Sequence, residues 1–428
     1  MRKIQMVDTK NQYLAIKAEV DGAIQEVLDS AAYINGKVKQ WVIGQKGVWD
    51  EVNRLAEKIE KPVIWVHCAS YGEFEQGLPI IEKIKADYPG YQVWLTFFSP
   101  SGYLHRKNDP TVDFVTYLPM DGASNAKHFF DIVHPKLVIF IKYEFWFYYL
   151  SIAKEKNIPT VLASALFRQS QIFFQFYGGF YKKILNLFTA ILVQDQASED
   201  LIKPIISTSK ICVTGDTRFD RVISTASTVT KFEWIQKLSQ NKIIIAGSTW
   251  ETDHIVLAKT TLAFKKLNWI IVPHHVDANS IAECRIHFPK AITLTELLAS
   301  KQHFTLPTII MIDQIGILRS IYQYAYISYV GGGFGKDGVH NVLEPAAFGK
   351  PVIWGSNDNK YREAIGLRNI GGGFAIQNAE ALIDQIQLLI DVEKDYSNTC
   401  SLSAQYIIEH AGATHKTIEY LKEQQFLR

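Results

Sequence analysis

The chain alternates short, almost wholly apolar runs with stretches that repeat apolar residues every three or four positions. The runs are residues 63–67, 93–97, 137–141, 160–163 and 191–193, and then a second set at 243–246, 269–272, 309–312, 326–330 and 352–354. Near-continuous apolar strands alternating with helices predict parallel sheets covered on both faces. Because the rhythm stops and restarts, we expect an α/β protein with two doubly wound, Rossmann-like domains facing a cleft. In such folds ligands bind beyond the carboxyl ends of the strands.

Breaks in this pattern mark the expected domain boundaries. We predict a first domain over residues 38–215, a polar linker over 216–238, and a second domain over 239–428 whose last helix is a candidate to cross back to the first. Before them, we expect residues 1–37 to be a helical segment, because apolar side chains recur at helical spacing in it. A length of 428 residues also fits two domains.

Composition narrows the class of protein. Lys and Arg number 45 against 43 Asp and Glu, and this balance disfavours a dedicated nucleic-acid binder. The four cysteines are isolated from one another, which disfavours a zinc or redox site and suits a reducing compartment. We find no apolar run of about 18 residues and no apolar core of a signal peptide near the start, so we expect neither a transmembrane helix nor a secretory leader.

The first candidate chemistry follows the first apolar run. Gly72 permits a tight turn, and the helical spacing after it places Glu73 between the carboxyl end of a strand and the N-terminus of a helix. A carboxylate there can act as a general base if its pKa suits the operating pH. From position alone, a charge favoured by the helix dipole is the commoner explanation.

Glycine-rich and polar segments follow strands of the second set. Residues 331–335 read Gly-Gly-Gly-Phe-Gly, and residues 338–345 read Gly-Val-His-Asn-Val-Leu-Glu-Pro. A strand, a glycine loop and a helix in one place favour a nucleotide site. Residues 247–249 follow another strand, and His274 and His275 follow the next. Adjacent histidines without a carboxylate cluster favour phosphate contact or solvent exposure over a metal.

A further candidate is aromatic and basic. Residues 142–149 include Glu144 within a run of aromatic side chains, and residues 173–183 are largely aromatic and end in two lysines. Packing in the core is the default explanation for such runs. An aromatic and basic surface would also suit an anionic amphiphile at a membrane interface.

Five signatures in this chain, in order, resemble those of the 3-deoxy-D-manno-octulosonic acid (Kdo) transferases of lipopolysaccharide synthesis. Residues 70–73 are similar to the family's SVGE, 144–146 to the end of its ETELW, 215–220 to its GNLKFD, 247–249 to its GST, and 340–345 to its GHNPLEP. The resemblance covers about residues 38–428. It implies a two-domain GT-B fold that moves Kdo from CMP-Kdo to the glucosamine disaccharide of a lipid A precursor, with inversion and without a metal or other cofactor.

Carried over residue by residue, the resemblance makes Glu73 the base that deprotonates the acceptor hydroxyl. It gives Glu144 and Arg218 a part in stabilising the transition state. The residues that it assigns to substrate binding are Ser70, Gly72, Gly247, Ser248, Thr249, Pro273, His274, Ile315, Gly316, Ile317, Asn341, Val342, Leu343 and Glu344.

Three segments depart from the family's pattern. Members often have Pro-Arg at residues 273–274 and Met-Gly-Glu at 315–317, so this chain lacks an arginine and a carboxylate at the expected donor site. Members also begin with an apolar membrane anchor, whereas residues 3–37 resemble the opening of PLP-dependent nucleotide-sugar aminotransferases. That fragment is far too short for the aminotransferase fold, so we expect no aminotransferase activity.

Without the anchor, we expect a peripheral protein on the cytoplasmic face of the bacterial inner membrane. Two other interpretations stay open. One is another GT-B nucleotide-sugar transferase, or an epimerase of the same fold. The other is a non-catalytic protein that binds a sugar nucleotide or a lipid.

Overall fold

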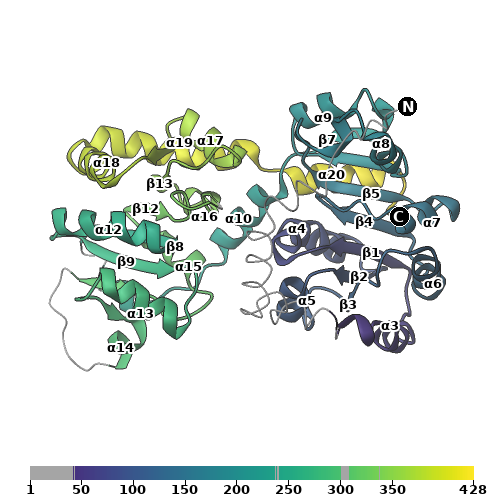
Figure 1. The fold of residues 1–428 in the computed structure, drawn as a ribbon, viewed down its shortest axis with the longest axis horizontal. Helices are drawn as coiled ribbons and strands as arrows, with labels where there is room; N and C mark the ends of the chain where they lie inside the picture. The colour runs from purple at the N-terminus through teal and green to yellow at the C-terminus, as the bar shows by residue number, and fades with distance from the viewer. Residues whose placement is uncertain (1–41, 43, 237, 239–240, 300–307, 337) are drawn as a thin grey trace, which may run out of the picture. The chain divides into compact units, whose positions relative to one another are not determined.

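The computed structural model describes residues 42 and 44–428, apart from 237, 239–240, 300–307 and 337. The chain divides into two compact units (Figure 1). Unit 1 contains the described residues up to Val213 together with Ile418–Arg428, and unit 2 is Thr214–Thr417. The helix predicted within residues 3–37 lies outside the described residues.

Unit 1 is built on seven parallel strands in the order β3-β2-β1-β4-β5-β6-β7. The strands are β1 Val63–Cys68, β2 Gln92–Phe97, β3 Phe114–Tyr117, β4 Leu137–Ile141, β5 Thr160–Ala165, β6 Ala190–Val193 and β7 Ile211–Val213. The helices are α3 Val48–Ala56, α4 Tyr71–Asp87, α5 Pro100–Arg106, α6 Ala123–Val133, α7 Phe147–Glu155, α8 Gly179–Leu185 and α9 Gln196–Ile202.

Unit 2 repeats this plan with the order β10-β11-β9-β8-β12-β13-β14, again parallel throughout. Its strands are β8 Ile243–Thr249, β9 Asn268–Pro273, β10 Ile292–Thr293, β11 Ile309–Met311, β12 Ile327–Val330, β13 Val352–Gly355 and β14 Gly373–Ile376. Its helices are α10 Thr217–Ser227, α11 Glu233–Gln236, α12 Glu251–Ala263, α13 Ala278–His287, α14 Leu294–Ala299, α15 Leu318–Ile321, α16 Leu343–Ala346, α17 Arg362–Asn369, α18 Ala379–Asp391 and α19 Glu393–His410, and α20 Ala413–Glu423 then leads into unit 1.

The predicted fold class is confirmed, and all ten predicted strands are present. The four strands that the apolar pattern missed are β3, β7, β10 and β14, which are the edge strands of the two sheets. The prediction of a linker over 216–238 is wrong. That stretch contains α10 and α11, and the boundary between the units lies between Val213 and Thr214.

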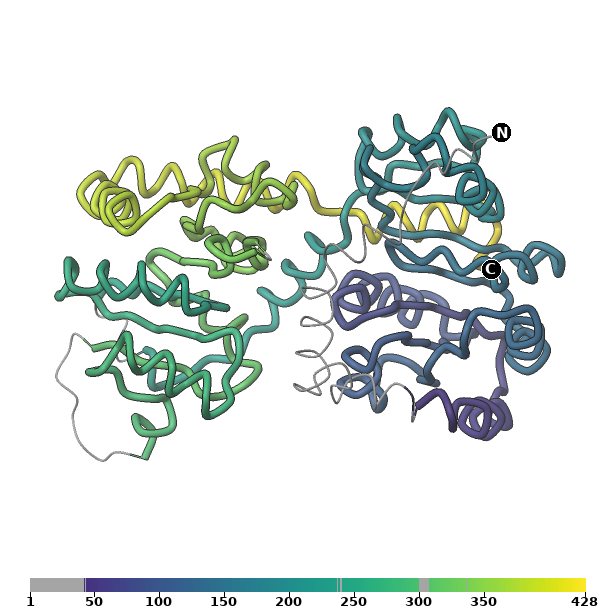
Figure 2. Tube along the Cα trace, in the orientation of Figure 1, coloured from purple at the N-terminus to yellow at the C-terminus, as the bar shows by residue number. Residues whose placement is uncertain are grey.

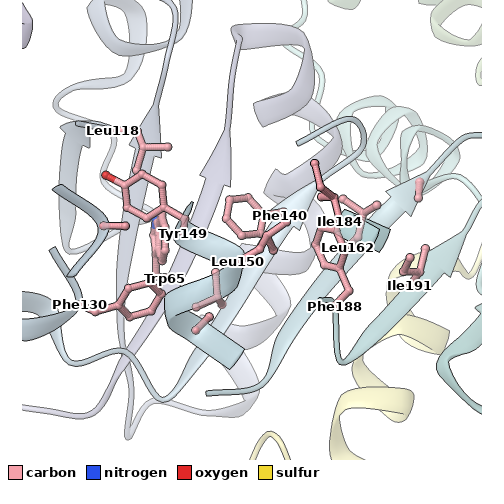
Figure 3. Close-up of a cluster of buried hydrophobic side chains, with 14 of the residues drawn as sticks. Trp65, Leu118, Phe130, Phe140, Tyr149, Leu150, Leu162, Ile184, Phe188 and Ile191 are labelled. Atoms are coloured by element: carbon pink, nitrogen blue, oxygen red, sulfur yellow. The ribbon is translucent and has the colours of Figure 1, made fainter. Parts of the chain in front are cut away.

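The sheet of unit 1 is buried on both faces because successive side chains point to opposite sides. Trp65, Phe140 and Leu162 lie on one face, against helices such as α6 and α7 (Figure 3). Ile64 and Ile139 lie on the other face, against α4 and α20. The last segment of the chain, traced in yellow in Figure 2, thus supplies part of the core of unit 1.

This contribution can be tested with Leu421→Ala. Leu421 is fully buried in α20, so truncating it should lower the free energy of unfolding by about 2–5 kcal/mol. Leu262→Ala, at a side chain that is 69% exposed, serves as the control and should change it by about 0.5 kcal/mol or less. The urea midpoints of the two variants measure the difference. Equal midpoints would contradict the role of α20.

Candidate active site

The loops after β1 and β4 carry the two carboxylates singled out in the sequence. These strands pair directly, and the order of strands along the sheet reverses between them. Such a reversal leaves a crevice at the carboxyl ends of the strands, where open α/β sheets bind their ligands. Unit 1 therefore brings Glu73 and Glu144 together at the expected place.

Glu73 stands in the first turn of α4. The backbone N–H of Ser70, the residue that caps this helix, donates a hydrogen bond to its Oε2 at 3.1 Å. The side chain is nevertheless largely buried. Burial, and then the negative charge of Glu144, raise the pKa of Glu73 to about 7. Glu73 is also the third residue of a capping box with Ser70, as the helix-terminus explanation predicts, and its raised pKa is an additional property that a general base near neutrality would need.

Glu144 is almost completely buried, with 5% of its surface exposed. Its Oε2 accepts hydrogen bonds from Nε2 of His67 at 3.0 Å and from the indole N–H of Trp146. Lys142, two residues earlier, has a φ of 70°, which costs energy for a residue with a side chain. The loop after β4 therefore has a strained backbone position two residues before this carboxylate.

Behind His67 the hydrogen bonds continue into the sheet. Thr96 lies opposite it on β2, with its hydroxyl oxygen 2.8 Å from Nδ1 of His67. The same oxygen accepts a hydrogen bond from the indole N–H of Trp65 at 2.8 Å. Nε2 of His67 is the donor to Glu144, because a carboxylate oxygen accepts, and Thr96 holds the opposite side of the ring through Nδ1.

Unit 2 has its own reversal of strand order, between β8 and β12. Gly247 and Thr249 lie at the end of β8, where their carbonyl oxygens accept from the N–H groups of Gly331 and His274, each at 2.9 Å. Between them Ser248 has a φ of 54°, a second strained position at the end of a strand. The segments predicted to bind the donor after β8, β9 and β12 therefore do converge.

The glycine loop after β12 is shaped by the protein's own backbone. A Cβ atom on Gly331 would lie 2.3 Å from the carbonyl oxygen of Ser248. Gly332 has a φ of +89°, and a Cβ there would lie 2.4 Å from the oxygen of Gly338. Close packing within unit 2 is thus sufficient to require both glycines, and the approach of a phosphate is not needed to explain them. The helix expected near Glu344 is short, α16, with four residues.

An aromatic cluster that the sequence did not predict lines this end of unit 2. Trp250 donates from its indole N–H to Nε2 of His340 at 2.7 Å, and the rings of His274 and Trp250 stack with centroids 4.5 Å apart. His274 also stacks on His340 at 4.5 Å. His275 meets Trp250 edge-on and also lies edge-on to His274, with ring centroids 4.7 Å apart, so the paired histidines read from the sequence stay in contact.

An ion pair joins α15, the helix that follows residues 315–317, to residues 341–344. Arg319, two residues after Ile317, donates from Nε to Glu344 at 2.9 Å, and Asn341 donates to the same carboxylate oxygen at 3.2 Å. Ile315 itself is 87% exposed.

Arg218 lies in unit 2 at the start of α10, whereas Glu73 and Glu144 lie in unit 1. It donates from Nε and Nη2 to Asp216, with a shortest distance of 2.7 Å, and from Nη1 to Glu363 at 2.6 Å. Two carboxylates therefore fix this guanidinium. Glu363 is 145 positions further along the chain, so a local sequence pattern cannot predict that it pairs with Arg218.

Sequence reasoning missed several further residues at these two sites. They are Thr96, Trp250, Arg319 and Glu363, together with His67 and Trp146, which lie in the candidate segments but were given no role. One of them left a signal, since His67 is a titratable residue inside an otherwise apolar strand. Within the described part of the chain, no three His, Cys, Asp or Glu side chains come together as a metal site.

Known proteins with similar folds define the class. A UDP-GlcNAc 2-epimerase from Neisseria meningitidis matches 85% of this chain and all of its own, with a TM-score of 0.61 at 14% identity. A glycosyltransferase from Rickettsia africae matches 85% of this chain and 99% of its own, with a TM-score of 0.56 at 15% identity. At such identities the similarity shows the fold alone, which is the two-domain GT-B architecture.

Sequence comparison is more specific. Residues 46–221 match the model of the 3-deoxy-D-manno-octulosonic-acid transferase (kdotransferase) family. The Kdo transferase of Aquifex aeolicus is 29% identical over 344 residues, which are 78% of this chain and 88% of the relative. That of Chlamydia pneumoniae is 27% identical over 348 residues, 78% of each chain. The resemblance read from the motifs is thus confirmed: this chain is a glycosyltransferase related to the Kdo transferases.

The raised pKa of Glu73 predicts how stability depends on pH. The folded state holds this proton up to about pH 7, whereas the unfolded chain releases it near the ordinary value of 4.5. The folded protein therefore loses stability as the pH rises from about 4.5 to about 7. Glu73→Gln mimics the protonated form, so it should be more stable than the wild type at pH 8 by on the order of 1–3 kcal/mol, and by much less at pH 5.

Urea unfolding at the two pH values measures this difference. Glu57→Gln, at an exposed carboxylate of unit 1, is the control and should show no such change with pH. If the difference in unfolding free energy between Glu73→Gln and the wild type is the same at pH 5 and pH 8, Glu73 does not have a raised pKa in the folded protein.

Proposed function

We propose that this chain transfers Kdo from CMP-Kdo to the sugar of a lipid A precursor in lipopolysaccharide synthesis, with inversion and without a metal ion. The observation that carries the proposal is the carboxylate pair of unit 1. It lies at the strand-order reversal, within the segment that matches the Kdo transferase family model, and one member has a pKa of about 7. A general base is most effective when its pKa lies near the operating pH.

In this mechanism Glu73 removes the proton of the acceptor hydroxyl. The freed oxygen attacks the anomeric carbon of Kdo on the face opposite CMP, and the bond from that carbon to the phosphate oxygen breaks. The electron pair leaves with CMP, and the proton stays on the Glu73 carboxylate. Attack from the opposite face inverts the anomeric carbon, so no covalent sugar–enzyme bond is needed.

Two fixed charges would stabilise the transition state. The Glu144 carboxylate would oppose the positive charge that develops at the anomeric carbon, in a site where burial strengthens the interaction. Arg218 would use guanidinium N–H groups beyond those given to Asp216 and Glu363, and these would bind the phosphate of the leaving CMP.

The donor nucleotide would lie at the strand-order reversal of unit 2. There residues 247–249, His274 and residues 341–344 surround one end of the sheet, and the stacked rings of Trp250, His274 and His340 offer flat apolar surface beside polar groups. The departures from the family at residues 274 and 317 would be offset by the His274 ring and by Arg319, which is paired with Glu344.

The test is direct transfer with purified protein, CMP-Kdo and a tetraacylated lipid A precursor, with the product identified by mass. Glu73→Gln should lower kcat by about 10²–10⁴-fold while CMP-Kdo binding is retained, because the amide cannot accept the proton. The wild-type rate should rise with pH as Glu73 ionises around pH 7. EDTA should leave the rate unchanged.

Glu57→Gln is the matched control for this assay and should transfer Kdo at the wild-type rate. Near-normal turnover by Glu73→Gln would remove Glu73 from the role of base. A rate that EDTA abolishes and only added magnesium or manganese restores would defeat the metal-free mechanism.

The acceptor is a lipid, so we also propose that unit 1 associates with the membrane surface at the cytoplasmic face of the inner membrane. No helix in the described part of the chain is long and apolar enough to cross a bilayer. The candidate for this contact is a set of exposed side chains in unit 1, four aromatic and one basic: Tyr148, Phe176, Tyr177, Phe180 and Lys183. Phe176 is 98% exposed and Tyr177 61%.

One residue of the segment predicted to form this surface belongs elsewhere. Phe173 is 3% exposed and packs against Phe145, with ring centroids 4.7 Å apart. The prediction of an interface running from Phe173 onward is therefore corrected: Phe173 lies in the core, and the exposed aromatic side chains begin at Phe176.

A triple variant, Phe176→Ser, Phe180→Ser and Lys183→Glu, should lose most sedimentation with anionic vesicles while staying folded. Aromatic side chains enter the headgroup boundary, and each cation near an anionic surface adds about 1 kcal/mol, which salt weakens. The control is Leu262→Ser, Ile286→Ser and Lys290→Glu, which changes exposed side chains of unit 2 and should sediment as the wild type does. Unchanged binding by the first variant would overturn the surface.

A further inference from the structure

A polar chain is buried in the apolar core of unit 1, beside the carboxylate pair. His67 is fully buried on β1 and shares a face of the sheet with Trp65. On β2 its partner is Thr96, and on β4 it is Phe140, whose ring meets the imidazole edge-on at 5.6 Å. Trp146 meets it edge-on at 5.7 Å. The imidazole is therefore surrounded by side chains of β2 and β4 and by Trp146 from the loop after β4.

This polar chain has a direction. The indole of Trp65 donates to Thr96, the Thr96 hydroxyl and Nδ1 of His67 share a hydrogen bond, and Nε2 of His67 donates to Glu144. The chain begins at a donor-only group and ends at an acceptor-only group, so each group between them has a satisfied partner on both sides. Rotation of the imidazole would break two hydrogen bonds in a buried site, which costs several kcal/mol in total.

The other five side chains of β1 are apolar, so the packing of this strand by itself does not call for a histidine. What His67 provides is a fixed donor to a carboxylate that is itself almost completely buried. Trp146 donates to the same oxygen, and hydrogen bonds to the charged form of a buried carboxylate favour that form.

The charge of Glu144 has a neighbour to act on. It is the second-largest cause of the raised pKa of Glu73, after burial. Lys142, from the same loop as Glu144, lowers the pKa of Glu73 through its positive charge. The negative charges of both carboxylates, after burial, raise the pKa of Cys68 at the end of β1. The position of Glu144 thus affects the pKa of the proposed base, Glu73, and that of the neighbouring thiol of Cys68.

We propose that His67 is a positioning residue: by donating from Nε2, it fixes the orientation of the Glu144 carboxylate beside Glu73. This rests on the proposed function of that carboxylate pair. His67 touches neither substrate in this role and acts only through Glu144. Thr96 and Trp65 hold the imidazole in the donating orientation.

The test compares His67→Leu, which removes the donor, with His67→Gln, whose amide N–H can replace it. His67→Leu should lower kcat by about 10²-fold with little change in the KM for CMP-Kdo, since a displaced catalytic group costs about that much. His67→Gln should recover at least a tenth of the wild-type kcat, as expected if the donor matters. Equal losses in both variants would overturn the proposal.

A second measurement needs no substrate. The carboxyl of Glu73 can be titrated by ¹³C NMR, with Glu73→Gln identifying its resonance. Without the His67 donor, the Glu144 carboxylate is no longer held in place beside Glu73, so its negative charge acts more weakly on Glu73. The titration midpoint of Glu73 should therefore fall below the wild-type value in His67→Leu. An unchanged midpoint would show that His67 contributes only to folding, which would overturn the proposal.

The chain offers a matched control for loss of stability. Trp94 on β2 donates to Thr116 on β3 at 3.0 Å, a buried indole–hydroxyl bond of the same kind as that between Trp65 and Thr96. Thr96→Val and Thr116→Val should destabilise unit 1 to a similar extent, but only Thr96→Val should shift the midpoint of Glu73 and lower kcat. Equal effects of the two valine variants on kcat and midpoint would overturn the proposal.

These two readouts separate the two levels of inference. If the wild type transfers no Kdo, the proposed function fails, while the Glu73 titration still decides the role of His67. If His67→Leu does not fold, His67→Gln and Thr96→Val carry the same comparison.

Discussion

Burial of a parallel sheet on both faces is the constraint on which the rest of each unit depends. Every side chain of β1 and β4 is buried, because helices cover both sides of the sheet. Side chains of the strands therefore have almost no access to solvent, and polar groups gather where the strands end. In both units the reversal of strand order opens that end, and the candidate functional residues lie there.

The exceptions to apolar burial are informative for the same reason. A polar group inside such a sheet is costly unless every hydrogen bond is made. In unit 1 the buried groups at positions 67 and 96 satisfy that condition and lead to Glu144. In unit 2, Asp253 is fully buried and accepts from Tyr329 at 2.7 Å and from the N–H of Gly332 at 2.9 Å, and so ties α12 to the glycine loop. Each network ends at a loop that the sequence had marked for chemistry.

The proposed glycosyl transfer would need a base, a fixed negative charge and a cation, and the two units hold the candidate residues for these roles in different ways. Unit 1 uses burial and a like charge to bring a carboxyl pKa near neutrality. Unit 2 holds its guanidinium between two carboxylates, so that its orientation is fixed before any substrate binds. In both cases neighbouring groups set the chemical character of the residue, which fits electrostatic preorganisation as the main source of stabilisation in the proposed mechanism.

The sequence by itself determined the fold class, the ten inner strands and the loops with the site residues, because buried strands and strand-end glycines leave local patterns. It could not show the four edge strands, which pair on one side only and three of which are just partly buried. It also misplaced Phe173, since an aromatic run reads alike in a core and on a surface. Only the tertiary structure decided which groups meet: Glu144 with His67 is a contact across 77 positions, and Arg218 with Glu363 one across 145. Hydrogen bonds and pKa shifts depend on distance and burial in three dimensions, and no spacing along the chain encodes them.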